Sequence, residues 1–307
     1  MGGNNLLRYL KDLVEKANVQ TKKRLAVAAC QDEEVLKAVH EAALSGIVEP
    51  ILIGDIEKTE RIAKELGISI KAYEKIDVIE LTDAAEKAVR QVSSGKADFL
   101  MKGLIDTSIL LKEVLSKEYG LRTDSLLSHV MIYQVPTYHK IILLTDGGMN
   151  LEPNLDDKVK ILRNAIKVCK ALGYDKIKVA AIAAKEKVNP KMIATVHADE
   201  LKKMSDKGAF EDGVIIDGPL ALDLAVSKEA AKIKGYNSQV AGDTDILLVP
   251  NIETGNGIGK SLTYFANSQS AGIIMGAKVP IVLVSRADSH EAKLYSIALG
   301  SIISELN

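Results

Sequence analysis

Hydrophobic residues along this chain follow two alternating patterns, short continuous runs and longer segments with helical spacing. The expected strands of the first part are RLAVAAC (24–30), ILIG (51–54), IDVIEL (76–81) and DFLM (98–101). The expected helices between them are 33–46, 56–66 and 83–93. Strands that alternate with helices in this way form parallel sheets with helices on both faces. The first part of the chain therefore predicts an α/β fold.

The pattern changes near the middle of the chain. The β-like runs HVMIYQV (129–135) and HKIILLTD (139–146) are so close together that they suit antiparallel neighbours better than a crossover. The alternation then resumes, and the expected elements are helices near 155–172 and 190–207, strands at 178–183, 213–217, 245–250 and 281–285, a short helix after 217, a helix from about 259 and an amphipathic helix at 289–303. We therefore expect two α/β lobes with a boundary near residue 134.

Composition excludes several classes of protein. The 307 residues suffice for two domains, and 40 basic against 41 acidic side chains give no basic footprint for nucleic acid. Residues 1–20 predict an amphipathic helix rather than a signal peptide, and no apolar run is long enough to span a membrane. The two cysteines and five histidines show no metal-ligand spacing. We expect a cytoplasmic protein that acts on small molecules, without nucleic acid, membrane or metal.

The glycine-rich segment ETGNGIGKS (253–261) follows an expected strand and is similar to a phosphate-binding P-loop. A P-loop requires GxxxxGK[ST], but Thr254 stands at its first glycine position and Glu253 would place a carboxylate beside the anion. Two interpretations remain open. The segment is either a flexible glycine turn that starts a helix, or a loop whose amides and following helix bind a phosphate group.

Three further segments place polar residues at the ends of expected strands, where α/β sheets bind ligands. Lys102 and Thr107 lie around a turn at Gly103, although Thr107 is also suited to an ordinary helix N-cap. Asp217 ends a strand and Asp223 follows in the next helix, with capping as the alternative for Asp217. Ser285 and Arg286 follow the last strand, and arginine offers a planar donor fork for phosphate.

Six motifs in order along the chain resemble those of one family. They are AVAACQDEEVLKAV (26–39), MKGLIDTSILLKEVL (101–115), RTDSLLSHV (122–130), DGPLALDLAV (217–226), VPNIETGNGIGKSLTYF (249–265) and PIVLVSRADSHEAKLYSIAL (280–299). Together they resemble the phosphate acetyl/butyryltransferases, most closely the butyryltransferase branch. In that family the glycine-rich segment is a PNxExGN motif and not a P-loop.

The resemblance implies two lobes of α/β/α type, similar to isocitrate and isopropylmalate dehydrogenases, with the active site in the cleft between them. The first domain would comprise 1–133 plus about 275–307, and the second 134–274. The implied reaction is reversible: acyl-CoA and phosphate give acyl phosphate and coenzyme A. These are substrates, so no permanently bound cofactor is expected, and the protein would be a homodimer or a larger homo-oligomer.

The resemblance also implies roles for residues. Arg286 and Arg122 would bind phosphate or acyl phosphate, and Ser285 would donate to the developing oxyanion. The further phosphate-binding candidates are Lys102, Thr107, Asn251, Gly255 and Asn256.

The general base for the coenzyme A thiol has three candidates. The acetyltransferase branch has an aspartate where this chain has Ala292, so Glu291 is the favoured base and Asp288 and His290 are alternatives. Asp217 and Asp223 are supporting candidates. The form SRADSHE is that of the butyryltransferase branch and favours a short acyl chain longer than acetyl.

Three other functions remain as alternatives. The first is a phosphate acetyltransferase of the same family. The second is a metal- and NAD-dependent decarboxylating dehydrogenase of the same fold, which requires clustered aspartates, and Asp217 and Asp223 do not complete such a set. The third is a ligand-binding relative without catalysis.

Overall fold

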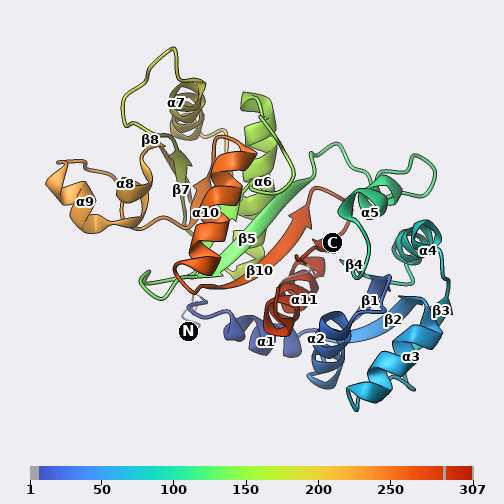
Figure 1. Ribbon diagram of the computed structural model, residues 1–307. Coiled ribbons are helices and arrows are strands. Elements are labelled where there is room, and N and C mark those ends of the chain that lie inside the picture. The colour runs from blue at the N-terminus through green and yellow to red at the C-terminus, as the bar shows by residue number, and fades with distance from the viewer. Residues whose placement is uncertain (1–6, 286–287, 306–307) are drawn as a thin grey trace. The chain divides into compact units, whose positions relative to one another are not determined.

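The computed structural model describes residues 7–285 and 288–305. The chain forms two compact units (Figure 1). Unit 1 comprises Met1–Tyr9 and Leu126–Ser270, and unit 2 comprises Leu10–Ser125 and Ala271–Asn307. Both contain helices and a mostly parallel sheet, so the predicted α/β class is confirmed. Among the helices described, none is long and apolar enough to cross a membrane.

The sheet of unit 2 has the order β3-β2-β1-β4-β11-β10. Its strands are β1 (Lys23–Ala28), β2 (Val48–Gly54), β3 (Glu74–Asp77), β4 (Phe99–Lys102), β10 (Gln269–Met275) and β11 (Ile281–Val282). All pairings here are parallel except β10 with β11. Strands β1 and β4 are buried on both faces, which explains their continuous apolar sequences.

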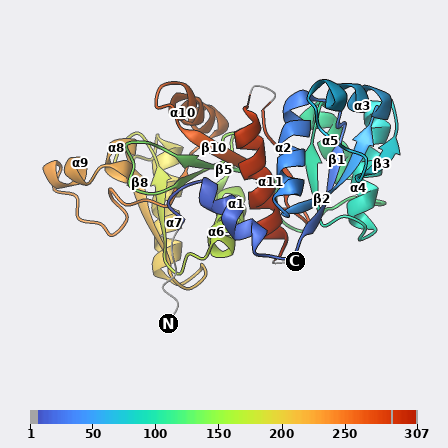
Figure 2. The same ribbon diagram turned by 90° about the horizontal axis from the view of Figure 1, so that it is seen from below.

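Unit 2 contains six helices among the described residues. They are α1 (Lys11–Asn18), α2 (Glu33–Leu44), α3 (Ile56–Glu65), α4 (Leu81–Ser93), α5 (Thr107–Val114) and α11 (His290–Ser304). Helix α11 lies beside α1 and α2 and also contacts β4 and β11 (Figure 2). It is therefore buried almost all round, and the prediction of an amphipathic helix at 289–303 was wrong in character although right in position.

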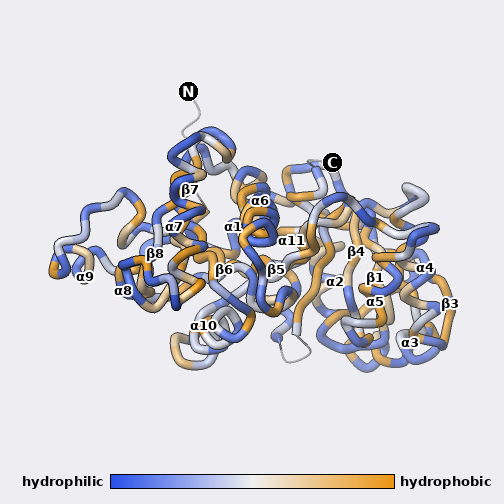
Figure 3. The backbone as a smooth tube through the Cα atoms, turned by 90° about the horizontal axis from the view of Figure 1, so that it is seen from above, coloured by the Kyte–Doolittle hydropathy of each residue, from blue (hydrophilic) through white to orange (hydrophobic). Residues whose placement is uncertain are grey.

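Unit 1 has the strand order β5-β6-β9-β7-β8. Its strands are β5 (Ser128–Gln134), β6 (Ile142–Thr145), β7 (Ile177–Ile182), β8 (Val214–Leu220) and β9 (Ile246–Leu248). Its helices are α6 (Leu155–Leu172), α7 (Ile193–Asp206), α8 (Leu222–Val226), α9 (Lys228–Ile233) and α10 (Ile252–Tyr264). Strands β5 and β6 pair antiparallel, which confirms the predicted pair. Figure 3 shows the hydrophobic residues of both units concentrated along the strands.

Helix α10 contradicts one expectation. The glycine-rich segment 253–261 is neither a flexible turn nor a loop, because the helix begins at Ile252 and continues through all of it. The Asn251 side chain accepts hydrogen bonds from the Thr254 amide at 3.0 Å and the Thr254 hydroxyl at 2.7 Å, and so caps the helix. Packing then outweighs the low helix propensity of glycine, since Gly255 and Gly259 are the buried residues of this helix.

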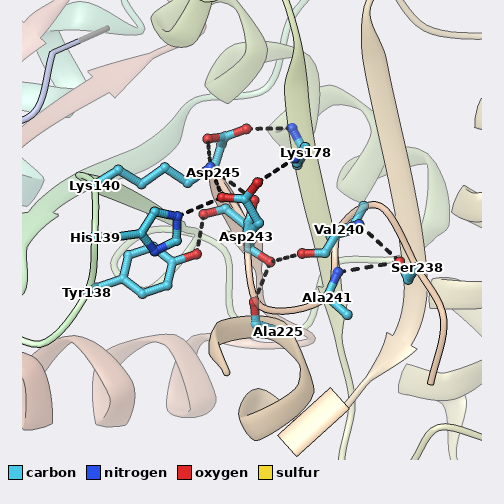
Figure 4. Close-up of polar contacts among 11 residues, drawn as sticks. Tyr138, His139, Lys140, Lys178, Ala225, Ser238, Val240, Ala241, Asp243 and Asp245 are labelled. Atoms are coloured by element: carbon cyan, nitrogen blue, oxygen red, sulfur yellow. Dashed lines mark hydrogen bonds and ion pairs between the residues drawn. The ribbon is translucent and has the colours of Figure 1, made fainter. Parts of the chain in front are cut away.

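A charge cluster closes the amino-terminal end of the unit 1 sheet (Figure 4). Asp243 contacts His139 Nε2 at 2.7 Å and Lys140 Nζ at 3.0 Å, and it also pairs with Lys178. Asp245 pairs with Lys140 at 2.5 Å and accepts from the Lys178 amide at 2.7 Å. Burial raises the pKa of Asp243, but the hydrogen bonds from Lys178, His139 and Lys140 outweigh it and hold that pKa well below its ordinary value.

Asp243→Asn is expected to destabilise unit 1 by about 2 kcal/mol at pH 7, since it leaves a partly buried set of cations without one carboxylate. A depressed folded-state pKa gives stability that is present above the unfolded pKa and is lost as the pH falls through the lower folded value. The difference between wild type and variant should therefore shrink below about pH 4. Urea unfolding of both proteins between pH 3 and 7 measures this difference in the free energy of unfolding. Glu86→Gln, in an exposed pair with Arg90, is the control and should change stability little. A constant difference across this range would contradict the assignment.

Candidate active site

The carboxyl ends of three parallel strands meet at one edge of the unit 2 sheet. Strand β4 pairs with β1 on one side and with β11 on the other. Lys102 ends β4, Ala29 follows β1 and Ser285 follows β11. The chain runs from β1 to β2 on one side and returns to β4 on the other, so the strand order reverses between β1 and β4. Such a switch point is where open α/β sheets bind ligands.

The turn after β4 is tightly fixed. Gly103 donates its amide to Ala28 O at 2.8 Å, and Leu104 donates to Ala29 O at 2.7 Å. Ala29 has φ +58°, a left-handed conformation that non-glycine residues seldom adopt and that is often found at functional sites. The ammonium group of buried Lys102 donates to Ile105 O at 2.8 Å and Gly103 O at 3.3 Å. The Lys102 ammonium group is thus fixed by the turn at the carboxyl end of β4.

The segment after β11 is organised by its own polar groups. The Ser285 amide donates to Asp288 Oδ2 at 2.7 Å, and the Asp288 amide donates back to Ser285 O at 3.1 Å. Lys293, only 2% exposed, donates its ammonium to Asp288 O and to Ser285 O, the latter at 3.5 Å. This leaves the Ser285 backbone fixed while its side chain lies in an exposed position. Arg286 lies outside the described residues.

The candidate bases lie at the start of α11. The Ser289 hydroxyl caps this helix by accepting from the Ala292 amide at 3.3 Å. A hydrogen bond from Ser289 is also the largest cause that lowers the pKa of Glu291, whose carboxylate is half exposed. His290 lies among carboxylates, 3.8 Å from Glu291, 3.9 Å from Glu34 and 3.9 Å from Glu41.

Thr107 and Arg122 are the two other candidates of unit 2. Thr107 is the first residue of α5, and Asp106 occupies the N-cap position that was the alternative for Thr107. Arg122 is exposed, and its neighbours anchor it to the turn before β11: Leu121 O accepts from the Lys278 amide at 2.8 Å, and the Thr123 hydroxyl donates to Gly276 O at 2.5 Å. The backbone on either side of Arg122 is thus bonded to the turn before β11, whereas Ser285 follows β11.

The PNxExGN candidates lie on α10 of unit 1. Gly255 packs against the turn after β6, where an added Cβ would lie 2.6 Å from Gly147 Cα. Asn256 is exposed and its side-chain amide lies 3.5 Å from Gly147 O, the limit of a hydrogen bond. Asn251 is used in capping α10, so at least two of the three residues have structural roles.

The supporting aspartates are both paired with lysines. Asp217 lies inside β8, not at its end as expected, because the strand continues to Leu220. Its carboxylate accepts from Lys202 at 2.7 Å and from the Gly218 amide at 2.9 Å. Asp223 is half exposed and pairs with Lys234 at 2.9 Å. Within the described part of the chain, no three His, Cys, Asp or Glu residues are grouped so that they could hold a metal ion.

Comparison with known families decides the assignment. Residues 9–86 and 64–301 match the family described as phosphate acetyl/butaryl transferase. The chain belongs to this family. The resemblance drawn from the six motifs is thereby confirmed.

Members of the phosphate acetyl/butyryltransferase family match the chain over nearly its full length. Phosphate butyryltransferase of Clostridium acetobutylicum is 45% identical, covering 97% of this chain and 99% of the relative. Phosphate acetyltransferase of Thermotoga maritima is 44% identical, covering 96% and 99%. The crystal structure of a branched-chain phosphotransacylase from Enterococcus faecalis has a TM-score of 0.81 at 34% identity, covering 92% of this chain and 99% of that one.

Sequence reasoning missed Lys293 in this family member. The residue lies in KLYSIALGSII, the most apolar stretch of α11, and buried lysines are rare unless a partner is available. A single cation in an otherwise apolar helix was the available signal. Its partners, two carbonyl groups of the preceding segment, have no sequence signature.

Proposed function

We propose that this chain catalyses the reversible transfer of a short-chain acyl group between coenzyme A and inorganic phosphate, with butyryl-CoA as the preferred substrate. The observation that carries the proposal is the near-full-length identity of 45% to a phosphate butyryltransferase. A phosphate acetyltransferase remains the second candidate, because a relative of that name is 44% identical over a similar length.

The reaction needs no nucleophile from the protein. A phosphate oxygen attacks the thioester carbonyl, the carbon–sulfur bond breaks, and the thiolate takes up a proton. The protein must orient phosphate, stabilise the carbonyl oxygen as it gains charge, and move the proton of the thiol. Direct transfer between the two bound substrates satisfies these requirements.

We assign the oxyanion donor to the Ser285 hydroxyl. The fixed Ser285 backbone and the exposed position of its side chain support this assignment. Glu291 remains the proposed base, because its half-exposed carboxylate is accessible, whereas the Asp288 carboxylate already accepts the Ser285 amide. The pH–rate profiles of the Glu291→Gln and Asp288→Asn variants show which of these two residues is the base.

Phosphate binding by Arg286 and Arg122, with contributions from Lys102, Thr107 and Asn256, stays a proposal. So does an active site between two lobes, with domains 1–133 plus about 275–307 and 134–274. The same holds for the absence of a permanently bound cofactor and for a cytoplasmic location.

The first experiment measures the release of coenzyme A thiol from butyryl-CoA, with and without phosphate, with acetyl-CoA in parallel and with EDTA in a matched set. Release that requires phosphate, survives EDTA and is faster with butyryl-CoA supports the proposal. Faster release from acetyl-CoA assigns the second candidate. Release without phosphate identifies a hydrolase and overturns the phosphate-binding roles. Loss of release with EDTA contradicts a metal-free reaction.

Lys293→Met is expected to raise the KM for phosphate at least about tenfold while the KM for butyryl-CoA changes little. Methionine keeps an unbranched apolar side chain but removes the donor that holds Ser285 O and Asp288 O. The variant also leaves two carbonyl groups without this donor, so its melting temperature is measured beside the kinetics, and a selective rise in one KM separates the effect from unfolding.

Lys158→Met is the matched control for this variant. Lys158 is also buried, on α6 of unit 1, and donates to Pro153 O at 3.0 Å beside His197 Nδ1 at 2.9 Å. Its substitution should leave both KM values unchanged. Equal changes in the two KM values of the Lys293→Met enzyme would contradict a positioning role for Lys293 toward phosphate.

A further inference from the structure

Lys158 on α6 and His197 on α7 meet in the interior of unit 1. Lys158 is only 4% exposed, and its ammonium group donates to Pro153 O at 3.0 Å and to His197 Nδ1 at 2.9 Å. Within the described part of the chain, no carboxylate forms an ion pair with this ammonium group. Charged lysines are seldom buried without such a partner. The surroundings of Lys158 therefore disfavour its charged form.

The pKa shifts of the two groups agree with this geometry. Burial lowers the pKa of Lys158 to about 8, although the neighbouring Asp157 carboxylate raises it. Burial and the Lys158 ammonium group lower the pKa of His197, so its imidazole is neutral at pH 8 and Nδ1 accepts a proton. About half of Lys158 is then a neutral amine at pH 8, compared with less than about 1% of a lysine with the ordinary pKa. A neutral, desolvated lysine is a nucleophile.

A small cavity reaches both groups. Its other lining residues are apolar and include Ala181 and Ile182 at the end of β7 and Leu248 at the end of β9. The cavity leaves about 10 Å³ for the centre of a water-sized molecule, which is room for one such molecule. An anion such as phosphate is larger and would lose its hydration against these apolar side chains. The cavity thus suits a small uncharged electrophile, and carbon dioxide has this character.

We propose that Lys158 binds carbon dioxide reversibly as a carbamate. His197 Nδ1 takes one proton from the ammonium group, and the part-exposed imidazole passes it to solvent. The amine lone pair forms a nitrogen–carbon bond with carbon dioxide, and an electron pair of one carbon–oxygen double bond moves to that oxygen. The nitrogen then loses a second proton, which stays on the imidazole. An ammonium group, an imidazole and carbon dioxide thus give a carbamate, an imidazolium and one free proton.

The same two partners suit the product. The carbamate nitrogen keeps one N–H group that donates to Pro153 O, and the His197 imidazolium donates to a carbamate oxygen. A buried cation is thereby exchanged for a pair of opposite charges. The carbamate is independent of the acyl transfer proposed for the protein, because neither Lys158 nor His197 has a part in that reaction.

The test traps the carbamate with a trialkyloxonium ion, which converts it into a stable ester on its lysine. The whole chain is equilibrated at pH 8 with carbon dioxide and bicarbonate labelled with heavy carbon, trapped, digested and analysed by mass spectrometry. The expected result is a labelled ester on Lys158, at least about tenfold more abundant than on exposed Lys64, which is almost wholly protonated at this pH.

Carbon NMR of the same sample supplies the controls. The carbamate signal should disappear in Lys158→Met, remain in Lys293→Met, which removes another buried lysine, and disappear from wild type on degassing. His197→Asn should slow incorporation of the label at least about tenfold, because it removes the proton acceptor. Incorporation at the wild-type rate would contradict the role given to His197.

Three results would overturn the proposal. The first is a wild-type protein without an ester on Lys158, a result that does not depend on whether Lys158→Met folds. The second is a label spread evenly over the exposed lysines, which would show that the buried position confers no reactivity. The third is a signal that survives degassing, because a carbamate returns to amine and carbon dioxide.

Discussion

Ser285→Ala is expected to lower kcat about 10²–10³-fold for butyryl-CoA at saturating phosphate, the usual effect of removing one oxyanion donor. Asp288 accepts the Ser285 amide, and Lys293 and the Asp288 amide hold the Ser285 carbonyl. All of these contacts are to the backbone and remain in the alanine variant. The lost rate therefore reports the hydroxyl group itself.

The measurement is initial-rate kinetics with both substrates varied, so that kcat separates from the two KM values. Ser93→Ala, at an exposed position near the end of α4, is the control and should behave as wild type. A Ser285→Ala enzyme within about twofold of wild-type kcat would remove the hydroxyl group from the mechanism. A larger KM for phosphate with normal kcat would instead make Ser285 a phosphate-binding residue.

The strongly periodic elements were predictable from the sequence. Helix α6, expected near 155–172, is Leu155–Leu172, and the antiparallel pair around Pro136 is β5 and β6. Strand β10 was not expected, because SAGIIM has few large apolar residues and becomes a strand through its antiparallel pairing with β11. The sequence predicts that α10 begins only near residue 259, because glycine has a low helix propensity. In the structure, the packing of Gly255 against Gly147 outweighs that propensity.

The sequence predicts where single residues of the candidate site lie along the chain, but not the contacts between them. The position of Ser285 after the last strand follows from hydrophobic periodicity and the rule for α/β sheets. Periodicity does not show that the segment around Arg122 is bonded to the turn before β11, because this depends on Leu121 and Thr123 meeting residues more than a hundred positions away. Nor does it show that Lys293 is directed to the Ser285 carbonyl. Contacts of this kind arise from tertiary packing, and no local sequence pattern indicates them.

Gly103→Ala is expected to destabilise unit 2 by at least about 3 kcal/mol, the range for severe steric conflict in a packed interior. The new Cβ would lie 2.1 Å from Ala29 O and 2.8 Å from Ala28 O. These are backbone atoms, so no side chain can turn aside to make room. The strand cannot shift either, because Ala28 is paired with Lys102 across β1 and β4. Gly103 has no left-handed φ, so the loss is purely steric.

Gly95→Ala separates steric conflict from conformational strain. Gly95 has φ +74° with nothing within 4 Å of an added Cβ, so only the left-handed conformation opposes alanine there, at a cost of about 1–2 kcal/mol. Urea unfolding of both variants measures their free energies of unfolding. If Gly103→Ala does not fold, its recovery in the soluble fraction should be lower than that of Gly95→Ala. A loss at Gly103 no greater than at Gly95 would contradict the tight turn. The turn bears on the proposed phosphate-binding role of Lys102, because the Lys102 ammonium donates to Gly103 O and a displaced Gly103 would move that ammonium group.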